Sequence, residues 1–124
     1  MARILVIDDD ELIRDTLRRI LQQAGHQVDM AEHGGIGLEA LQRRPVDLVI
    51  CDLFMPDMEG FETMRSIRER HADLKIIAMS GGARGLDRDA FLDDAEILHA
   101  DATLPKPFKN SDLIGLVEEL LASP

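Results

Sequence analysis

Acidic side chains directly follow two of the most apolar short segments of this sequence. They are Asp8, Asp9, Asp10 and Glu11 after the segment Ile4–Ile7, and Asp52 after the segment Asp47–Cys51. If the two segments are neighbouring strands, these carboxylates meet at one edge of a sheet, where they repel one another unless they are solvated or a cation lies among them. Carboxylate oxygens without histidine or thiolate ligands suit a hard cation that keeps some of its water, and Mg²⁺ fits best.

A simpler explanation covers only some of these acidic residues. Asp9, Asp10 and Glu11 precede a helical pattern, and negative side chains stabilise the positive N-terminus of a helix. This explanation does not extend to Asp52, which ends an apolar run and precedes a Phe-Met-Pro-Asp loop. We therefore interpret the set as a candidate magnesium site.

Two further apolar runs end in groups of complementary chemistry. Ser80 follows the run Lys75–Met79, and Lys106 follows Ala102–Leu104 and a proline. A hydroxyl and an ammonium beside a carboxylate cluster are what a transferred phosphoryl group requires, namely a hydrogen-bond donor and a positive charge in addition to a metal. Taken singly, a serine in this position is usually a turn residue and a lysine is usually a solvated charge.

Five apolar runs alternate along the chain with segments of helical spacing. The runs, interpreted as strands, are Ile4–Ile7, Gln27–Ala31, Asp47–Cys51, Lys75–Met79 and Ala102–Leu104. The five helical segments contain Leu12 to Leu21, residues 33–44, 60–70 and 87–99, and Leu113 to Leu121. This alternation predicts an α/β fold, with a parallel sheet covered by helices on both faces and ligands bound beyond the carboxyl ends of the strands.

Composition limits the classes of protein to which the chain can belong. At 124 residues, with 45% hydrophobic and 31% charged residues, we expect one soluble domain over residues 1–124 with no output domain. The net charge of −10 argues against direct binding to nucleic acid or to anionic membranes. The N-terminus lacks the pattern of an export signal and Cys51 fits a buried core position, so we expect a cytoplasmic location.

Four motifs together resemble the receiver domains of bacterial response regulators, the phosphorelay proteins of two-component signalling. The motifs are Ile4–Asp10, Asp47–Gly60, Ala78–Gly81 and Lys106–Phe108, each placed at the end of an expected strand. The resemblance spans the whole chain. It implies a flavodoxin-like, doubly wound fold with five parallel strands in the order 2-1-3-4-5 and five helices, as in the stand-alone chemotaxis regulator.

The resemblance also implies a role for each residue of the candidate site. Asp52 matches the phosphoacceptor, and Asp8 and Asp9 match the pair that holds Mg²⁺ together with Asp52 and the backbone carbonyl of Phe54. Ser80 matches the switch hydroxyl and Lys106 the family's lysine, with a cis bond expected before Pro107. Thr103 occupies the position where the family usually has the aromatic residue of the switch, so transmission by aromatic rotation is not expected.

The family resemblance implies partners rather than an independent enzyme activity. A sensor histidine kinase or a phosphotransfer protein would supply the phosphoryl group, and the domain would catalyse only its own phosphorylation and dephosphorylation. Output would pass to another protein, from a monomer or a phosphorylation-dependent dimer.

Two alternatives stay open at this point. The first is a degenerate receiver that docks partners without phosphorylation, which Thr103 keeps under consideration. The second, remote alternative is a phosphohydrolase of the haloacid-dehalogenase type, because the run after Ile7 loosely fits that nucleophile motif. The cap domain and later acidic pair of such enzymes are not evident in the sequence.

Overall fold

The structure is a computed structural model of the chain that describes residues 1–53, 55, 59–80 and 100–123, with only the backbone of residues 59 and 80. Its strands are β1 (Arg3–Ile7), β2 (Gln27–Ala31), β3 (Leu48–Asp52), β4 (Lys75–Ser80) and β5 (Ala102–Pro105). Its helices are α1 (Glu11–Gln23), α2 (Gly34–Arg43), α3 (Glu59–Arg70) and α5 (Asn110–Ala122). The helix expected at 87–99 lies outside the described residues.

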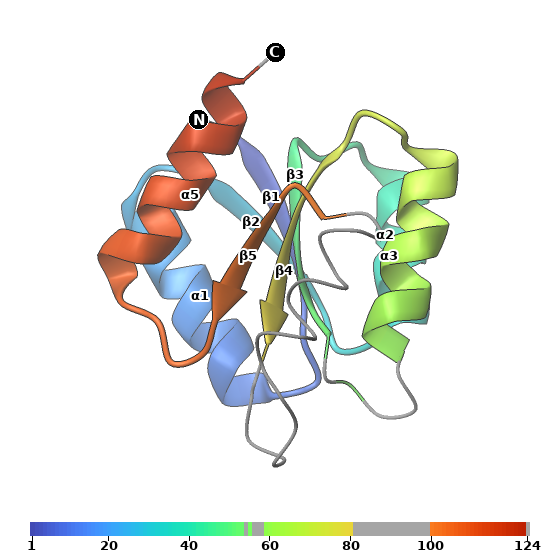
Figure 1. Cartoon of the computed structure of the whole chain (residues 1–124), viewed down its shortest axis with the longest axis horizontal. Helices are drawn as coiled ribbons and strands as arrows, with labels where there is room; N and C mark the ends of the chain where they lie inside the picture. Colours follow the sequence, from blue (N-terminus) through green and yellow to red (C-terminus); the bar gives the residue numbers. More distant parts are fainter. Residues whose placement is uncertain (54, 56–58, 81–99, 124) are drawn as a thin grey trace.

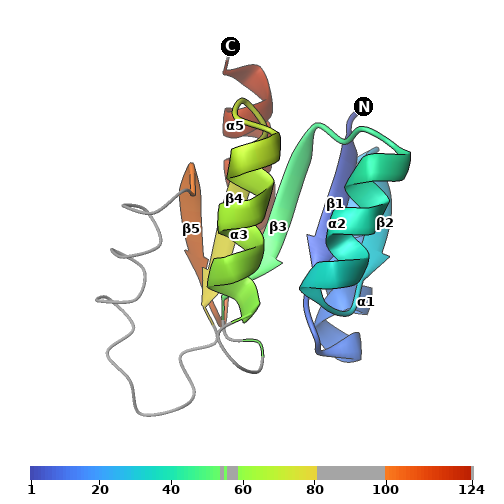
Figure 2. The same cartoon turned by 90° about the vertical axis from the view of Figure 1, so that its right-hand side faces the viewer.

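The strands form one parallel sheet in the order β2-β1-β3-β4-β5, which confirms the predicted fold. Helices α1 and α5 cover one face of this sheet and α2 and α3 cover the other (Figures 1 and 2). The strand order reverses between β1 and β3, where the two halves of the sheet meet. In open sheets of this kind, the crevice beyond the carboxyl ends at that point is where ligands bind.

Alternate residues of each central strand supply two separate cores. In β1, Leu5 and Ile7 belong to the core with α2 and α3, whereas Ile4 and Val6 belong to the core with α1 and α5. This division follows from the period of two in a strand. Every residue of β3 is buried, because β3 is the middle strand and helices cover both of its faces.

Helix α1 begins immediately after the acidic run that follows β1. The side chain of Asp10 accepts hydrogen bonds from the backbone N–H groups of Leu12, at 2.9 Å, and Ile13, at 3.4 Å, and so caps the helix. The helix ends before Gly25, whose φ of 96° lies in the region that glycine adopts most readily.

Among the described residues, no helix combines the length and apolar character that crossing a membrane requires.

Candidate metal centre

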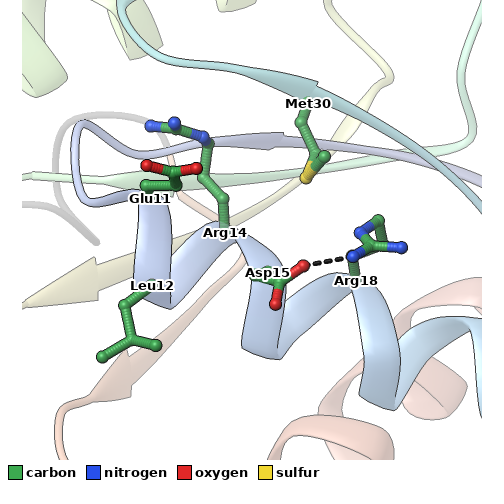
Figure 3. A pocket seen from close by; sticks show the side chains of 6 residues that line it. All are labelled: Glu11, Leu12, Arg14, Asp15, Arg18 and Met30. Carbon is green, nitrogen blue, oxygen red and sulfur yellow. Dashed lines mark hydrogen bonds and ion pairs between the residues drawn. The ribbon is translucent and has the colours of Figure 1, made fainter.

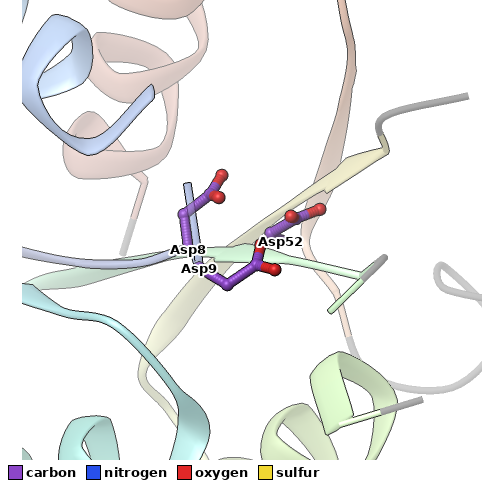
Figure 4. A group of neighbouring side chains, drawn as sticks. All are labelled: Asp8, Asp9 and Asp52. Atoms are coloured by element: carbon purple, nitrogen blue, oxygen red, sulfur yellow. The ribbon is translucent and has the colours of Figure 1, made fainter. Parts of the chain in front are cut away.

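The candidate site lies where β1 and β3 end side by side. Ile7 of β1 is in register with Cys51 of β3, so the residue after each of them stands at the same edge of the sheet. Carboxylate oxygens of Asp8, Asp9 and Asp52 all lie within 4.8 Å of one another (Figure 4). The sequence placed Asp52 just after the third strand; in the structure it is the last residue of β3, in register with Met79.

Asp8 is the most tightly held carboxylate of the cluster. Its side chain is fully buried, with Oδ1 accepting a hydrogen bond from the Asp10 N–H at 2.9 Å and Oδ2 accepting one from the Lys106 ammonium at 3.0 Å. The backbone carbonyl of Asp8 accepts a further bond from Nη1 of Arg14 at 2.7 Å. These contacts satisfy both carboxylate oxygens and fix the turn between β1 and α1.

Asp52 and Asp9 complete the cluster from environments of opposite kinds. Asp52 is only 3% exposed, and its Oδ2 lies 3.5 Å from the ammonium of Lys106. Asp9 is exposed, at the start of the loop that leads to α1. A ligand entering from solvent therefore meets Asp9 before it reaches Asp52.

Lys106 reaches the cluster from the edge strand β5. It directly follows β5, and the Lys106–Pro107 peptide bond is cis, as the sequence predicted. Its ammonium forms the two described ion pairs of the cluster, with Asp8 and Asp52. One lysine therefore offsets only part of the charge of three carboxylates in the described part of the site.

These donors are chemically suited to a hard divalent cation. All three side chains present carboxylate oxygens, which lie close enough together to coordinate one ion. The negative charge that Lys106 does not offset also favours a cation. Asp8, Asp9 and Asp52 could therefore hold Mg²⁺.

The remaining site residues expected from the sequence differ in what the structure describes. Ser80 is the last residue of β4 and is in register with Pro105 of β5. The Ser80 backbone therefore lies beside the residue that directly precedes Lys106. Thr103 is in register with Ala78, further from the carboxyl end, and is half-buried. Phe54 and the side chain of Ser80 lie outside the described part of the chain.

Sequence reasoning did not identify the contact between Arg14 and the carbonyl of Asp8. The available signal was a basic residue at helical spacing one turn after the cap Asp10. The sequence assigned Asp8 and Asp9 to the metal pair through the resemblance, but it did not single out Asp10 as the residue that caps α1.

A surface pocket lies along α1 and reaches β2, close to the acidic loop between β1 and α1 (Figure 3). Its lining residues are Glu11, Leu12, Arg14, Asp15, Arg18 and Met30. The side chain of Arg18 donates a hydrogen bond to Asp15, which lowers the pKa of the Asp15 carboxyl, and the charges of Arg19 and Arg18 act in the same direction against partial desolvation. We assign the chemistry to the carboxylate cluster, because the acidic side chains of the pocket have their own arginine partners or face solvent.

The fold and this cluster together define a flavodoxin-like domain with an acidic site at the point where the strand order reverses. The family model of the response regulator receiver domain matches residues 4–118, and the chain belongs to that family.

The solved structures most useful for comparison are themselves receiver proteins. The receiver domain of NtrX from Brucella abortus is 28% identical with a TM-score of 0.90, over 98% of this chain and 99% of that chain. The chemotaxis protein CheY4 of Vibrio cholerae is 27% identical with a TM-score of 0.85, over 97% of this chain and 98% of that chain.

The curated relatives are longer proteins. The response regulator MprA of Mycobacterium sp. (strain KMS) is 36% identical over 120 residues, which is 97% of this chain and 50% of MprA. MprA of Mycobacterium leprae is 36% identical over 119 residues, with 96% and 50% covered. The chain thus spans half the length of these relatives.

Proposed function

We propose that residues 1–124 act as one receiver domain that accepts a phosphoryl group on Asp52. The observation that carries this proposal is the position of Asp52, at the end of the central strand, 3.5 Å from the Lys106 ammonium and within a cluster of carboxylates. The exposed Asp9 has no such ammonium among its described contacts and suits a metal ligand better.

The proposed reaction is a direct phosphoryl transfer to the carboxylate of Asp52. One of its oxygens forms a bond to phosphorus while the bond between phosphorus and the imidazole nitrogen of a donor phosphohistidine breaks. The imidazole nitrogen keeps the electron pair of the broken bond; the ring leaves as neutral imidazole if its other nitrogen carries a proton, and otherwise takes one proton from the solvent. Hydrolysis later returns the carboxylate and inorganic phosphate.

The residues of this chain contribute position and charge to that transfer. Lys106 places a positive charge beside Asp52, where an added phosphoryl group increases the negative charge. Asp8, Asp9, Asp52 and the backbone carbonyl of Phe54 are the proposed Mg²⁺ ligands. Bound Mg²⁺ would reduce the repulsion between the anionic acceptor and the anionic donor.

Response regulators receive signals from histidine kinases and pass them to effectors, and we extend this to the present chain. The donor would be a sensor histidine kinase or a phosphotransfer protein in the cytoplasm. A downstream protein effector would receive the signal from this domain. We propose that Ser80 and Thr103 respond to phosphorylation, with a threonine hydroxyl in place of the aromatic switch. We expect no independent enzyme activity on other substrates.

A small phosphodonor tests the proposal without knowledge of the kinase. The chain is incubated with Mg²⁺ and acetyl phosphate, and its intact mass is measured. We expect the mass of one phosphoryl group to be gained by the wild type and by Asp73→Asn, an exposed carboxylate at the other end of the sheet, but not by Asp52→Asn. No gain in the wild type, or an equal gain in Asp52→Asn, would contradict the assignment and favour phosphorylation-independent docking.

A further inference from the structure

The first turn of α3 lies directly against the end of β3. A Cβ atom added to Gly60 would stand 2.2 Å from the carbonyl oxygen of Asp52, 2.6 Å from Cα of Leu53 and 2.8 Å from its carbonyl oxygen. Ordinary contacts of such an atom begin at 3.4 Å, so the backbone would have to move by about 1 Å to accept any side chain. Gly60 is therefore required for space.

The other glycines show that this crowding is specific. A Cβ at Gly37 would stand 2.5 Å from Cδ1 of Ile7, the end of a side chain that can change rotamer. A Cβ at Gly115 would have no heavy atom within 4 Å. Only at Gly60, among the glycines compared, are the crowded atoms those of the backbone.

The crowded backbone is also the part of the chain that carries the acceptor. Asp52 is in register with Met79 of β4, and the N–H of Leu53 donates to the Met79 carbonyl at 2.8 Å. Strand β4 thus holds this backbone on one side, and Gly60 of α3 holds it on another. A side chain at position 60 therefore has two ways to be accommodated, by displacing α3 or by displacing Asp52 and Leu53.

We propose that Gly60 is a positioning residue for the phosphoacceptor. By allowing α3 to rest against the carbonyl oxygens of Asp52 and Leu53, it sets the place of the Asp52 carboxylate relative to Lys106 and the other acidic ligands. This inference rests on the proposed function of Asp52. It adds a residue that lies outside the acidic cluster and acts through the backbone.

The test compares three alanine variants of the whole chain. The variants are Gly60→Ala, Gly37→Ala as a packing control and Gly115→Ala as a control without crowding. Each is measured for thermal stability, for the dissociation constant of Mg²⁺ by calorimetry, and for the rate of phosphorylation by acetyl phosphate at saturating Mg²⁺. The stability measurement separates a packing effect from a positioning effect, because only positioning changes affinity and rate in a protein that remains folded.

We expect Gly60→Ala to bind Mg²⁺ about 10-fold to 100-fold more weakly and, because a displacement of about 1 Å can misalign a reacting group, to be phosphorylated about 100-fold more slowly. We expect Gly37→Ala to lose stability but to keep wild-type affinity and rate, and Gly115→Ala to keep all three properties. Wild-type affinity and rate in Gly60→Ala would overturn the proposal. An equal loss in Gly37→Ala would do the same, because the effect would then follow stability.

A folding defect in Gly60→Ala is handled by repeating the measurements in trimethylamine N-oxide, which favours compact states. If the variant stays unfolded there, Gly60 is a requirement of the fold and the positioning role is rejected. Failure of the proposed function is distinguishable, because the wild type and both control variants would then also remain unphosphorylated.

Discussion

The two ends of the sheet treat charge in different ways. Toward the amino ends of the strands, Arg3 at the start of β1 pairs with Asp29 of β2 at 3.2 Å, and Arg68 of α3 pairs with Asp101, just before β5, at 3.0 Å. At the carboxyl ends, the carboxylates of Asp8, Asp9 and Asp52 lie together, and Lys106 forms the described ion pairs with two of them. The amino end pairs opposite charges, whereas the carboxyl end gathers like charges.

This contrast indicates what each end contributes to the molecule. Asp101 accepts hydrogen bonds from Arg68 and from the N–H of Ile76, so it joins α3, β4 and the start of β5. Such satisfied contacts stabilise the fold. Crowded carboxylates lower stability when no cation is bound, and such local conflicts with stability occur at functional sites.

The largest predicted effect is the loss of the lysine from the carboxyl end. Lys106→Ala leaves the fully buried Asp8 without its ammonium partner, so we expect the free energy of unfolding to fall by about 3–5 kcal/mol. Chemical denaturation measures this, with the exposed Lys109→Ala as control. Added Mg²⁺ should recover part of the loss in Lys106→Ala, since it supplies a cation. Equal stability of the two variants would show that Asp8 does not depend on Lys106.

A change at the amino end should lower stability without changing the chemistry. Arg68 donates to the carbonyl oxygens of Ala72, at 2.8 Å, and Leu74, at 2.7 Å, besides its pair with Asp101. We expect Arg68→Ala to lose about 1–3 kcal/mol while its affinity for Mg²⁺ stays that of the wild type. Arg65→Ala, exposed on the same helix, is the matched control. A large change in metal affinity in Arg68→Ala would remove the distinction between the two ends.

Asp9 should show opposite effects on stability and on metal binding. Without metal, Asp9→Asn removes one of the crowded charges, so we expect a gain of about 1 kcal/mol in the free energy of unfolding. With metal, the same change removes a ligand and should weaken Mg²⁺ binding. Denaturation and calorimetry measure the two effects, and the paired carboxylate variant Asp29→Asn is the control. Loss of stability in metal-free Asp9→Asn would contradict the repulsion.

The smallest predicted effect concerns pH and a carboxylate on α1. The hydrogen bond from Arg18 holds the pKa of Asp15 below its ordinary value of 3.8. A lowered carboxyl pKa means that the pair adds stability above that ordinary value, and this contribution is lost as the pH falls through the folded-state pKa. We expect Arg18→Ala to raise the Asp15 pKa toward 3.8, as followed by NMR titration. Arg43→Ala, on α2, should leave it unchanged, and an unmoved pKa in Arg18→Ala would reject this cause.

The sequence predicted the parallel sheet and the meeting of acidic side chains at one of its edges, because both depend on local patterns and on the family motifs. The alternation of apolar runs predicted the strands, and the order followed from the resemblance. Asp8, Asp9 and Asp52 come together because neighbouring parallel strands end at one edge.

Contacts that depend on the packing of distant elements could not be read from local patterns. The crowding at Gly60 arises only when α3 meets β3, and the bond from Arg14 to Asp8 needs the loop to fold back. The sequence likewise could not tell which of the adjacent aspartates caps α1, since Asp9 and Asp10 have the same chemistry. The roles of Asp8, Asp9, Asp52 and Lys106, like those of Phe54, Ser80 and Thr103, remain predictions.

We infer that the carboxyl end of the sheet is a cation site, where Lys106 offsets only part of the charge of the three carboxylates among the described residues. The most direct measurement is thermal unfolding of the wild type and of Asp52→Asn, each with and without Mg²⁺. At a concentration 100 times the dissociation constant, a bound ligand adds about 2.7 kcal/mol, so we predict that Mg²⁺ raises the melting temperature of the wild type by several degrees and that of Asp52→Asn much less. An unchanged melting temperature in the wild type, or an equal rise in both proteins, would contradict the claim.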